Sequence, residues 1–257
     1  MAEVRSGPME RWLNRMAAAR WRRAAKGART SSLRDLRRRQ TEARSLRQHL
    51  DALLHVADER LALPLVGNTA FPRPHGTEWA WRPEMWRGAL PERGRAAVEK
   101  RQEIGGEVTV FHDCAISELT VRQVRNTRET DLAPYGMRLD VFRFDGSFLS
   151  VVLDLPPEAS QGLKKRHLIR LDTIVETEYP IELFARLNVR HGPNTEQLVR
   201  EIPLGEPEVM VEFDLAYSKL NERRVEKMWI DLIFEGPEMN QITIRDLTFC
   251  RYPRADI

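Results

Sequence analysis

Beyond Gly105, apolar residues alternate with polar ones through most of the chain, which is the period of β-strands that bury one face. Residues 181–190 show it most clearly: Ile, Leu, Ala, Leu and Val occupy the odd positions, and charged or amide side chains occupy most of the even ones. A chain that repeats this pattern must pair its strands and bury the apolar faces of its sheets against each other. The pattern therefore predicts a mainly β fold, an antiparallel β-sandwich.

Turn signals divide this part of the chain into separate strands. Asp145-Gly146 lies between two apolar runs and indicates a hairpin, while Pro156-Pro157 and Gly236-Pro237 mark further reversals. Strands are predicted over residues 107–112, 119–125, 137–144, 148–155, 167–175, 181–189, 198–202, 208–217, 227–234 and 241–252. So many short strands in succession favour two packed sheets.

The first 62 residues follow a helical period instead. One helix is predicted from Pro8 to Ala25, and a second from Ser32, which forms a capping-box-like pair with Asp35, to about Leu61. Residues 1–60 hold 15 Lys and Arg against 7 Asp and Glu, whereas the rest of the chain holds 26 against 31. We therefore expect a basic helical extension over residues 1–62, a Trp- and Pro-rich connector over residues 63–104 and a β-sandwich domain over residues 105–257.

The predicted connector holds an unusual group of aromatic residues. Trp79 and Trp81 are two positions apart and would share one face of an extended strand, and Trp86 follows the bend expected at Pro83. Because exposed aromatic rings stack on the apolar faces of sugars, Trp79, Trp81, Arg82 and Trp86 are the candidate ligand-binding residues. The alternative is that these rings plug an open end of the sandwich core, since tryptophan is usually well buried.

Two runs near the C-terminus, Met228 to Phe234 and Gln241 to Phe249, resemble the closing hairpin of galactose-binding-like jelly rolls. The resemblance implies a jelly-roll-like sandwich and, in many of those families, noncatalytic carbohydrate binding. Some members also hold a structural calcium ion. No pattern of residues in this sequence supports such a site, and we expect no cofactor.

The chain as a whole also resembles an uncharacterised family of alphaproteobacterial proteins. The Trp-rich connector, the stretch from Glu118 to Arg128 and the hairpin at Asp145-Gly146 carry this resemblance. It implies no function, because function lies in particular sites rather than in a fold.

Signatures of catalysis are weak throughout the sequence. His112-Asp113-Cys114 is the nearest approach to a nucleophile with its base, but adjacent residues of a strand point to opposite faces, and a packed strand end explains the run better. The histidines lack zinc-binding spacing, and no glycine-rich phosphate loop occurs. Carboxylates are plentiful in the strands, but a glycosidase needs two of them at a defined separation. The sequence favours a binding protein over an enzyme, with no metal site.

The first predicted helix suggests a different kind of binding. Its residues Arg11, Arg15, Arg22 and Arg23 would meet anionic headgroups while Trp12 enters the lipid interface. The same charges would make nonspecific contacts with nucleic acid, but no recognition motif accompanies them, so specific nucleic-acid binding is not expected. The remaining alternative is a solvated basic helix pair that covers an acidic part of its own β-domain.

Two cysteines, Cys114 and Cys250, are too few for a disulfide scaffold and favour reduced thiols in the cytoplasm. No apolar run approaches the roughly 20 residues of a membrane-spanning helix, although the basic helices would allow a membrane-peripheral location. The function predicted first is noncatalytic recognition of a saccharide through the β-sandwich. The alternative is a peripheral membrane or anionic-surface adaptor or scaffold that uses its basic amphipathic N-terminal helices, with the sandwich serving as a module for a protein partner.

Overall fold

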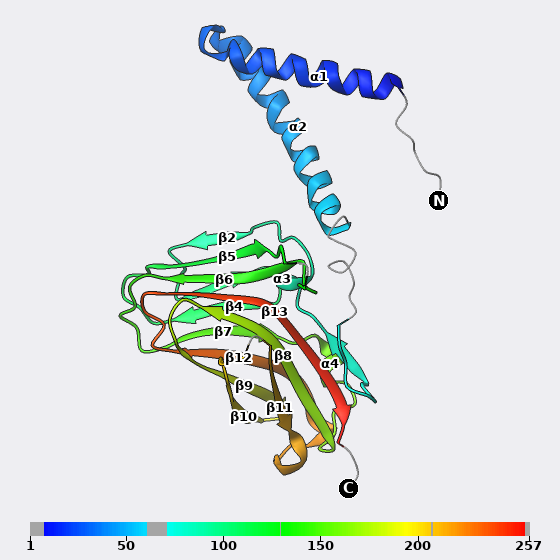
Figure 1. Ribbon diagram of the computed structural model, residues 1–257, viewed down its shortest axis with the longest axis vertical. Coiled ribbons are helices and arrows are strands. Elements are labelled where there is room, and N and C mark those ends of the chain that lie inside the picture. Colours follow the sequence, from blue (N-terminus) through cyan, green and yellow to red (C-terminus); the bar gives the residue numbers. More distant parts are fainter. Residues whose placement is uncertain (1–7, 61–70, 129, 207, 255–257) are drawn as a thin grey trace. The chain divides into compact units, whose positions relative to one another are not determined.

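The computed structural model describes residues 8–60, 71–128, 130–206 and 208–254. The chain divides into two compact units, residues 1–54 and 55–257. The first unit is helical, and the second contains the strands of the described residues (Figure 1). The predicted fold class, a mainly β antiparallel sandwich with N-terminal helices, is confirmed.

The helical unit consists of α1 (Pro8–Lys26), the short 3-10 helix η1 (Ala28–Thr30) and most of α2 (Leu33–Arg60). The predicted capping pair is present at the start of α2, where Ser32 Oγ accepts a hydrogen bond from the Asp35 N–H at 3.2 Å and donates to its carboxylate at 2.9 Å. Arg20 and Glu42 join the two helices through an ion pair of 2.7 Å. Both helices lie where their period predicted them.

Two antiparallel sheets make up the sandwich. The seven-stranded sheet has the order β11-β8-β13-β6-β5-β2, and β1 pairs with the C-terminal part of β13. Its strands are β1 (Trp79–Trp81), β2 (Gly94–Ala96), β5 (Leu119–Arg125), β6 (Tyr135–Val141), β8 (His167–Thr177), β11 (Val209–Asp214) and β13 (Asn240–Pro253).

The six-stranded sheet has the order β10-β9-β12-β7-β4-β3. Its strands are β3 (Arg101–Ile104), β4 (Val108–His112), β7 (Leu149–Asp154), β9 (Glu182–His191), β10 (Asn194–Ile202) and β12 (Val225–Glu235). Short helical segments fill some connections: α3 (Glu84–Arg87), α4 (Pro157–Ser160), η2 (Leu215–Tyr217) and η3 (Glu222–Arg224).

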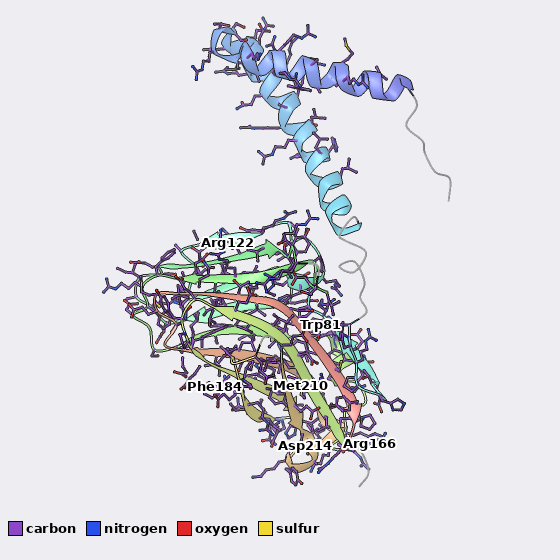
Figure 2. All side chains as sticks on the ribbon, viewed as in Figure 1. Trp81, Arg122, Arg166, Phe184, Met210 and Asp214 are labelled. Atoms are coloured by element: carbon purple, nitrogen blue, oxygen red, sulfur yellow. The ribbon has the colours of Figure 1, made fainter. Side chains whose placement is uncertain are left out.

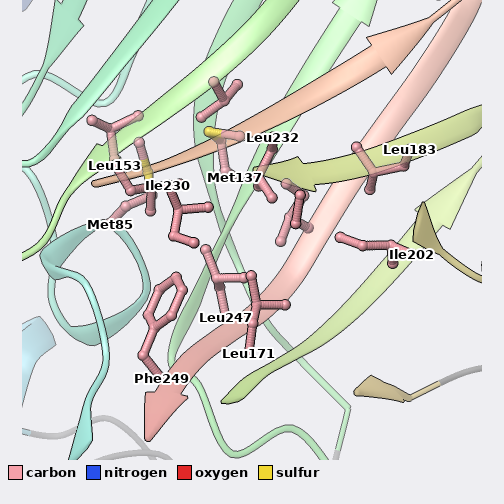
Figure 3. Packing of buried hydrophobic residues seen from close by; sticks show 14 of the residues in the cluster. Met85, Met137, Leu153, Leu171, Leu183, Ile202, Ile230, Leu232, Leu247 and Phe249 are labelled. Atoms are coloured by element: carbon pink, nitrogen blue, oxygen red, sulfur yellow. The ribbon is translucent and has the colours of Figure 1, made fainter. Parts of the chain in front are cut away.

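The core lies between the two sheets, where alternate side chains of both inner faces interdigitate (Figure 3). Leu183, Ile230 and Leu232 come from the six-stranded sheet, whereas Leu171 and Phe249 come from the seven-stranded sheet. All five side chains are buried. Burying a side chain of this size stabilises a fold by about 1.5–3 kcal/mol relative to leaving it exposed, so these alternating positions hold the sheets together.

Every strand predicted from the alternation is present in the structure. The largest difference is at β10, which begins at Asn194 although the prediction placed its start at Leu198. This strand lies at the edge of its sheet and is mostly exposed, so its sequence has little alternation.

The stretch expected to be a connector contributes to the sandwich over its described residues. β1 pairs with β13, β2 with β5 and β3 with β4. These strands have only three or four residues each, which is too short for a periodic pattern to be recognised. Residues 63–70 of the expected connector lie outside the described part of the chain. Among the helices that the structure describes, none has the length and apolar character to cross a membrane.

Candidate functional site

The tryptophans predicted to bind a ligand belong to the core or pack against it. Trp79 and Trp81 belong to β1, with ring centroids 6.3 Å apart, and the centroid of Trp81 lies 5.7 Å from that of Phe249. Trp86, on α3, is fully buried and donates its indole N–H to the Ile244 carbonyl oxygen at 2.8 Å. Trp81 is 9% exposed, and only Trp79 is partly accessible. Burial of this kind is what the alternative role, plugging the end of the sandwich, requires.

Arg82 is also buried, and its charge is matched within the protein. Its guanidinium donates two hydrogen bonds to the Asp246 carboxylate, from Nε at 2.9 Å and from Nη2 at 2.7 Å. Burial raises the pKa of Asp246, and the guanidinium opposes that rise. The structure thus brings together Trp81, Arg82 and Trp86, but mainly as interior groups. Ligand binding by these residues stays a prediction.

Beside Arg82, the outer side of the seven-stranded sheet carries a groove of about 260 Å³. Its lining includes Phe71, Asp172, Met210 and Thr248. The guanidinium carbons of Arg73 and Arg82 lie 4.9 Å and 5.1 Å from the centre of the Phe71 ring. Because two cations already contact this ring, it has little surface left for stacking on a ligand.

A broader polar and aromatic surface lies on the outer side of the six-stranded sheet. Leu187 and Ile230 point into the core, so their neighbours Asn188, Trp229 and Asp231 point to the opposite, solvent side. On this side, paired residues of neighbouring strands form three rows across the sheet, and we call the three rows together the outer face. The first row is Gln197, Asn188, Trp229 and Asp154, the second is Val199, Arg186, Asp231 and Val152, and the third is Phe184, Ile233, Ser150 and Phe111.

A hydrogen-bond network occupies the middle of the outer face. Asp231 is 4% exposed, and its carboxylate accepts hydrogen bonds from Arg186 Nε at 2.7 Å and from Asn188 Nδ2 at 3.0 Å. Gln197 in turn donates to Asn188 Oδ1 at 2.8 Å. Four polar side chains from three strands are therefore fixed in one arrangement, because hydrogen bonds connect each of them to another member of the network.

Aromatic rings lie on both sides of this network. Trp229 and Phe184 are half-buried, as sheet residues between close neighbours are, and Figure 2 labels Phe184 on β9. The Lys227 ammonium lies 5.6 Å from the centre of the Trp229 ring and pairs with Asp154 at 2.7 Å. The outer face thus combines partly exposed rings with fixed planar polar groups. Its formal charges are paired, Arg186 with Asp231 and Lys227 with Asp154.

Sequence analysis found part of this face without recognising it as a site. The alternation over residues 181–190 put Arg186 and Asn188 on the solvent side, but Trp229 was considered only within a hairpin that resembles other sandwiches. The alternation along residues 229–232 could have revealed this face, because it puts Trp229 and Asp231 on the side of the strand opposite to Ile230 and Leu232. Which strands lie beside β12 could not be read from the sequence.

The His112-Asp113-Cys114 run has a structural role. His112 Nε2 lies 2.9 Å from the Val98 carbonyl oxygen, and its Nδ1 accepts from the Cys114 N–H at 3.2 Å. Burial raises the pKa of the Cys114 thiol, which makes it a poor nucleophile. Asp113 instead accepts from the Ser147 hydroxyl at 2.6 Å. Within the described residues, no group of three or more His, Cys, Asp and Glu side chains could hold a metal ion.

The candidate residues of α1 fall into two groups. Arg15, Arg22 and Arg23 are exposed to solvent. Arg11 and Trp12 lie in the helix, but their side chains are outside the part of the chain that the structure describes.

The fold and the outer face define an antiparallel β-sandwich protein with a basic helical N-terminal unit. The chain belongs to a family of unknown function, DUF6478, whose model matches residues 1–257. None of the curated proteins matches it.

The solved structures that this chain is similar to include two carbohydrate-binding modules and a domain of a bacteriophage tailspike protein. A family 11 carbohydrate-binding module from Clostridium thermocellum, in complex with a beta-1,3-1,4-mixed-linked tetrasaccharide, is 12% identical, with a TM-score of 0.39 over 64% of this chain and 99% of that one. The CBM22-1 xylan-binding domain of Paenibacillus barcinonensis Xyn10C is 10% identical, with a TM-score of 0.34 over 57% and 87%. The enzymatically active domain of bacteriophage CBA120 tailspike protein 4 is 9% identical, with a TM-score of 0.41 over 60% and 21%. Similarities this remote say nothing about what this chain binds.

Proposed function

We propose that this protein is a noncatalytic glycan-binding protein and that the saccharide lies on the outer face of the six-stranded sheet. One observation carries the proposal: a fixed network of Arg186, Asn188, Gln197 and Asp231 lies between partly exposed aromatic rings on a solvent-facing sheet. The network satisfies the polar groups of Asn188 and Asp231, which are 1% and 4% exposed, and leaves Arg186 partly exposed and Gln197 exposed to solvent. A network held in place before binding lowers the entropy cost of taking up a ligand.

The chemistry of the outer face suits a neutral saccharide. Trp229 and Phe184 offer apolar ring surface for the C–H face of a pyranose, and sugar hydroxyls need donors and acceptors side by side. Among the described residues, neither Nη1 of Arg186 nor Oε1 of Gln197 has a hydrogen-bond partner, which leaves the two N–H groups of Nη1 as donors and Oε1 as an acceptor. Since Arg186 and Lys227 are each paired with a carboxylate, the face offers no unpaired cation for an anionic sugar.

The experiment is a glycan-array screen of the full-length protein, followed by calorimetry on the best saccharide. We expect Trp229→Ala to weaken binding at least about tenfold, because it removes the largest ring of the face. Met210→Ala is the matched control, since Met210 is 45% exposed on the opposite sheet, beside the groove. If the methionine variant loses binding and the tryptophan variant keeps it, the groove is the site and this proposal is wrong.

A second candidate function is attachment to an anionic surface through α1. The observation in its favour is that Leu13 and Met16 are 53% and 47% exposed on the same helix as exposed Arg15, Arg22 and Arg23. Apolar and basic side chains that are both accessible suit a lipid interface with negative headgroups. Co-sedimentation with phosphatidylserine vesicles tests this. We expect Arg22→Glu with Arg23→Glu to abolish it, and unchanged sedimentation of that variant would contradict the attachment.

A further inference from the structure

Four loops lie side by side at one end of the sandwich, and each crosses from one sheet to the other. They join β8 to β9 (residues 178–181), β12 to β13 (236–239), β6 to β7 (142–148) and β4 to β5 (113–118). β8, β13, β6 and β5 are consecutive in the seven-stranded sheet, and β9, β12, β7 and β4 are consecutive in the six-stranded sheet. The strand order therefore places the loops next to one another in that same sequence.

Each of these loops presents at least one large apolar side chain to solvent. The exposed fractions are 57% for Tyr179, 65% for Met239, 55% for Phe142, 44% for Phe148 and 70% for Ile116. Single exposed apolar residues are common on protein surfaces, but several on adjacent loops form a patch, and such patches mark interaction sites. We call these five residues the apolar end.

Hydrogen bonds join each loop to its neighbour. The Asn240 side chain accepts from the Tyr179 N–H at 3.1 Å, and the Met239 N–H donates to the Phe142 carbonyl oxygen at 3.1 Å. Asp113 accepts from the Ser147 N–H at 2.7 Å. Met239 itself has a φ of 53°, a conformation that is uncommon for residues other than glycine. The apolar end is thus held in shape by the loops rather than collapsed onto the core.

The loops of the apolar end are also acidic. Asp113, Glu118, Asp145, Glu178 and Glu238 lie in them, with Arg143 as the basic residue. All six are exposed. This excess of negative charge opposes contact with an anionic membrane, because like charges repel at its surface. It favours a partner that brings positive charge together with apolar side chains.

We propose that the apolar end is an interaction surface for a protein partner and takes a basic amphipathic segment. The partner's apolar side chains would cover residues such as Ile116 and Met239, while its Lys or Arg residues would face Glu118, Glu178 and Glu238. This surface is separate from the outer face, since the apolar end belongs to the loops between the sheets. The two proposals can therefore fail independently.

The test uses the full-length protein and a fluorescent 18-residue helical peptide of Leu and Lys as the probe. We expect the double variant Ile116→Ser/Met239→Ser to weaken peptide binding at least about tenfold, because both side chains are exposed and would be covered only in the complex. Glu178→Gln with Glu238→Gln should make binding less sensitive to salt. Tyr217→Ser is the matched control: Tyr217 is 83% exposed and follows β11 at the opposite end of the sandwich, and its loss should change binding less than about twofold.

Two results would overturn the proposal. Equal peptide binding by the wild-type protein and the double variant would show that the apolar end takes no part. Binding of phosphatidylcholine vesicles by the wild-type protein but not by the double variant, without peptide binding, would assign the apolar end to lipid insertion instead. Urea unfolding of each variant shows whether it is folded, and since the substituted side chains are exposed, we expect unchanged midpoints.

Discussion

At the scale of single residues, the pair of Arg82 and Asp246 is a buried ion pair on which the stability of the fold depends. The two side chains are only 4% and 11% exposed, and they form a bidentate ion pair with two hydrogen bonds. Removing one member of a buried ion pair leaves the other charge without compensation. The pair also joins residues far apart in the sequence, on the segment after β1 and on β13.

Arg82→Met should therefore lower the free energy of unfolding by about 3–5 kcal/mol. The double variant Arg82→Met/Asp246→Asn should recover part of that loss, because a neutral amide replaces the buried carboxylate. Urea unfolding followed by tryptophan fluorescence measures both. A single variant as stable as the wild-type protein would show that solvent reaches Asp246.

His167 gives the structure a pH dependence. Burial lowers its pKa from the usual value of 6.5, even though the Glu78 carboxylate acts in the opposite direction. The unfolded chain then binds a proton at higher pH than the folded chain. The stability that this histidine contributes is complete above pH 6.5 and decreases as the pH falls below that value.

His167→Gln should make the free energy of unfolding depend less on pH below pH 6.5. Glutamine can accept the hydrogen bond that His167 Nδ1 takes from the Lys164 N–H at 3.1 Å, and it does not titrate. Urea midpoints between pH 7.5 and 5 for both proteins test the expectation. Identical slopes would mean that other groups account for the acid sensitivity.

At the scale of secondary-structure elements, β1 shows how a very short strand can be essential. Its three residues pair with β13 and put Trp81 against Phe249 in the core. Trp81→Ala should lower the free energy of unfolding by about 3–5 kcal/mol, because it empties a large buried volume. Glycan affinity should stay unchanged if the outer face is the binding site. Lost affinity with unchanged stability would instead support the predicted ligand-binding role of this tryptophan.

At the scale of the whole molecule, the two units differ in how much they bury. The core residues all belong to the sandwich, whereas Leu33, Leu36, Leu46, Leu50 and Leu53 of α2 are exposed by 37% to 75%. Helices with so little tertiary packing open locally at low cost. Amide hydrogen exchange should therefore be complete in α1 and α2 long before it begins in β13. Equal protection of both would contradict this expectation.

The sequence alone was enough to predict the sandwich and the helical unit, because period and turn chemistry are local properties. The alternation of β9 and the hairpin signal at Asp145-Gly146 needed no knowledge of distant residues. The same reasoning could not place β1, β2 and β3, since three or four residues carry no readable period. Nor could it show that Trp81 and Arg82 are buried, because residue type does not reveal burial.

Only the tertiary structure decided which residues lie next to one another. Asn188, Gln197, Trp229 and Asp154 form one row because β10, β9, β12 and β7 are neighbours, and no local signal specifies that order. The same holds for the apolar end, where four loops from distant parts of the sequence meet through the pairing of their strands. Alternation determines which side of a strand a residue occupies. Strand pairing, which depends on the whole core, determines its neighbours across the sheet.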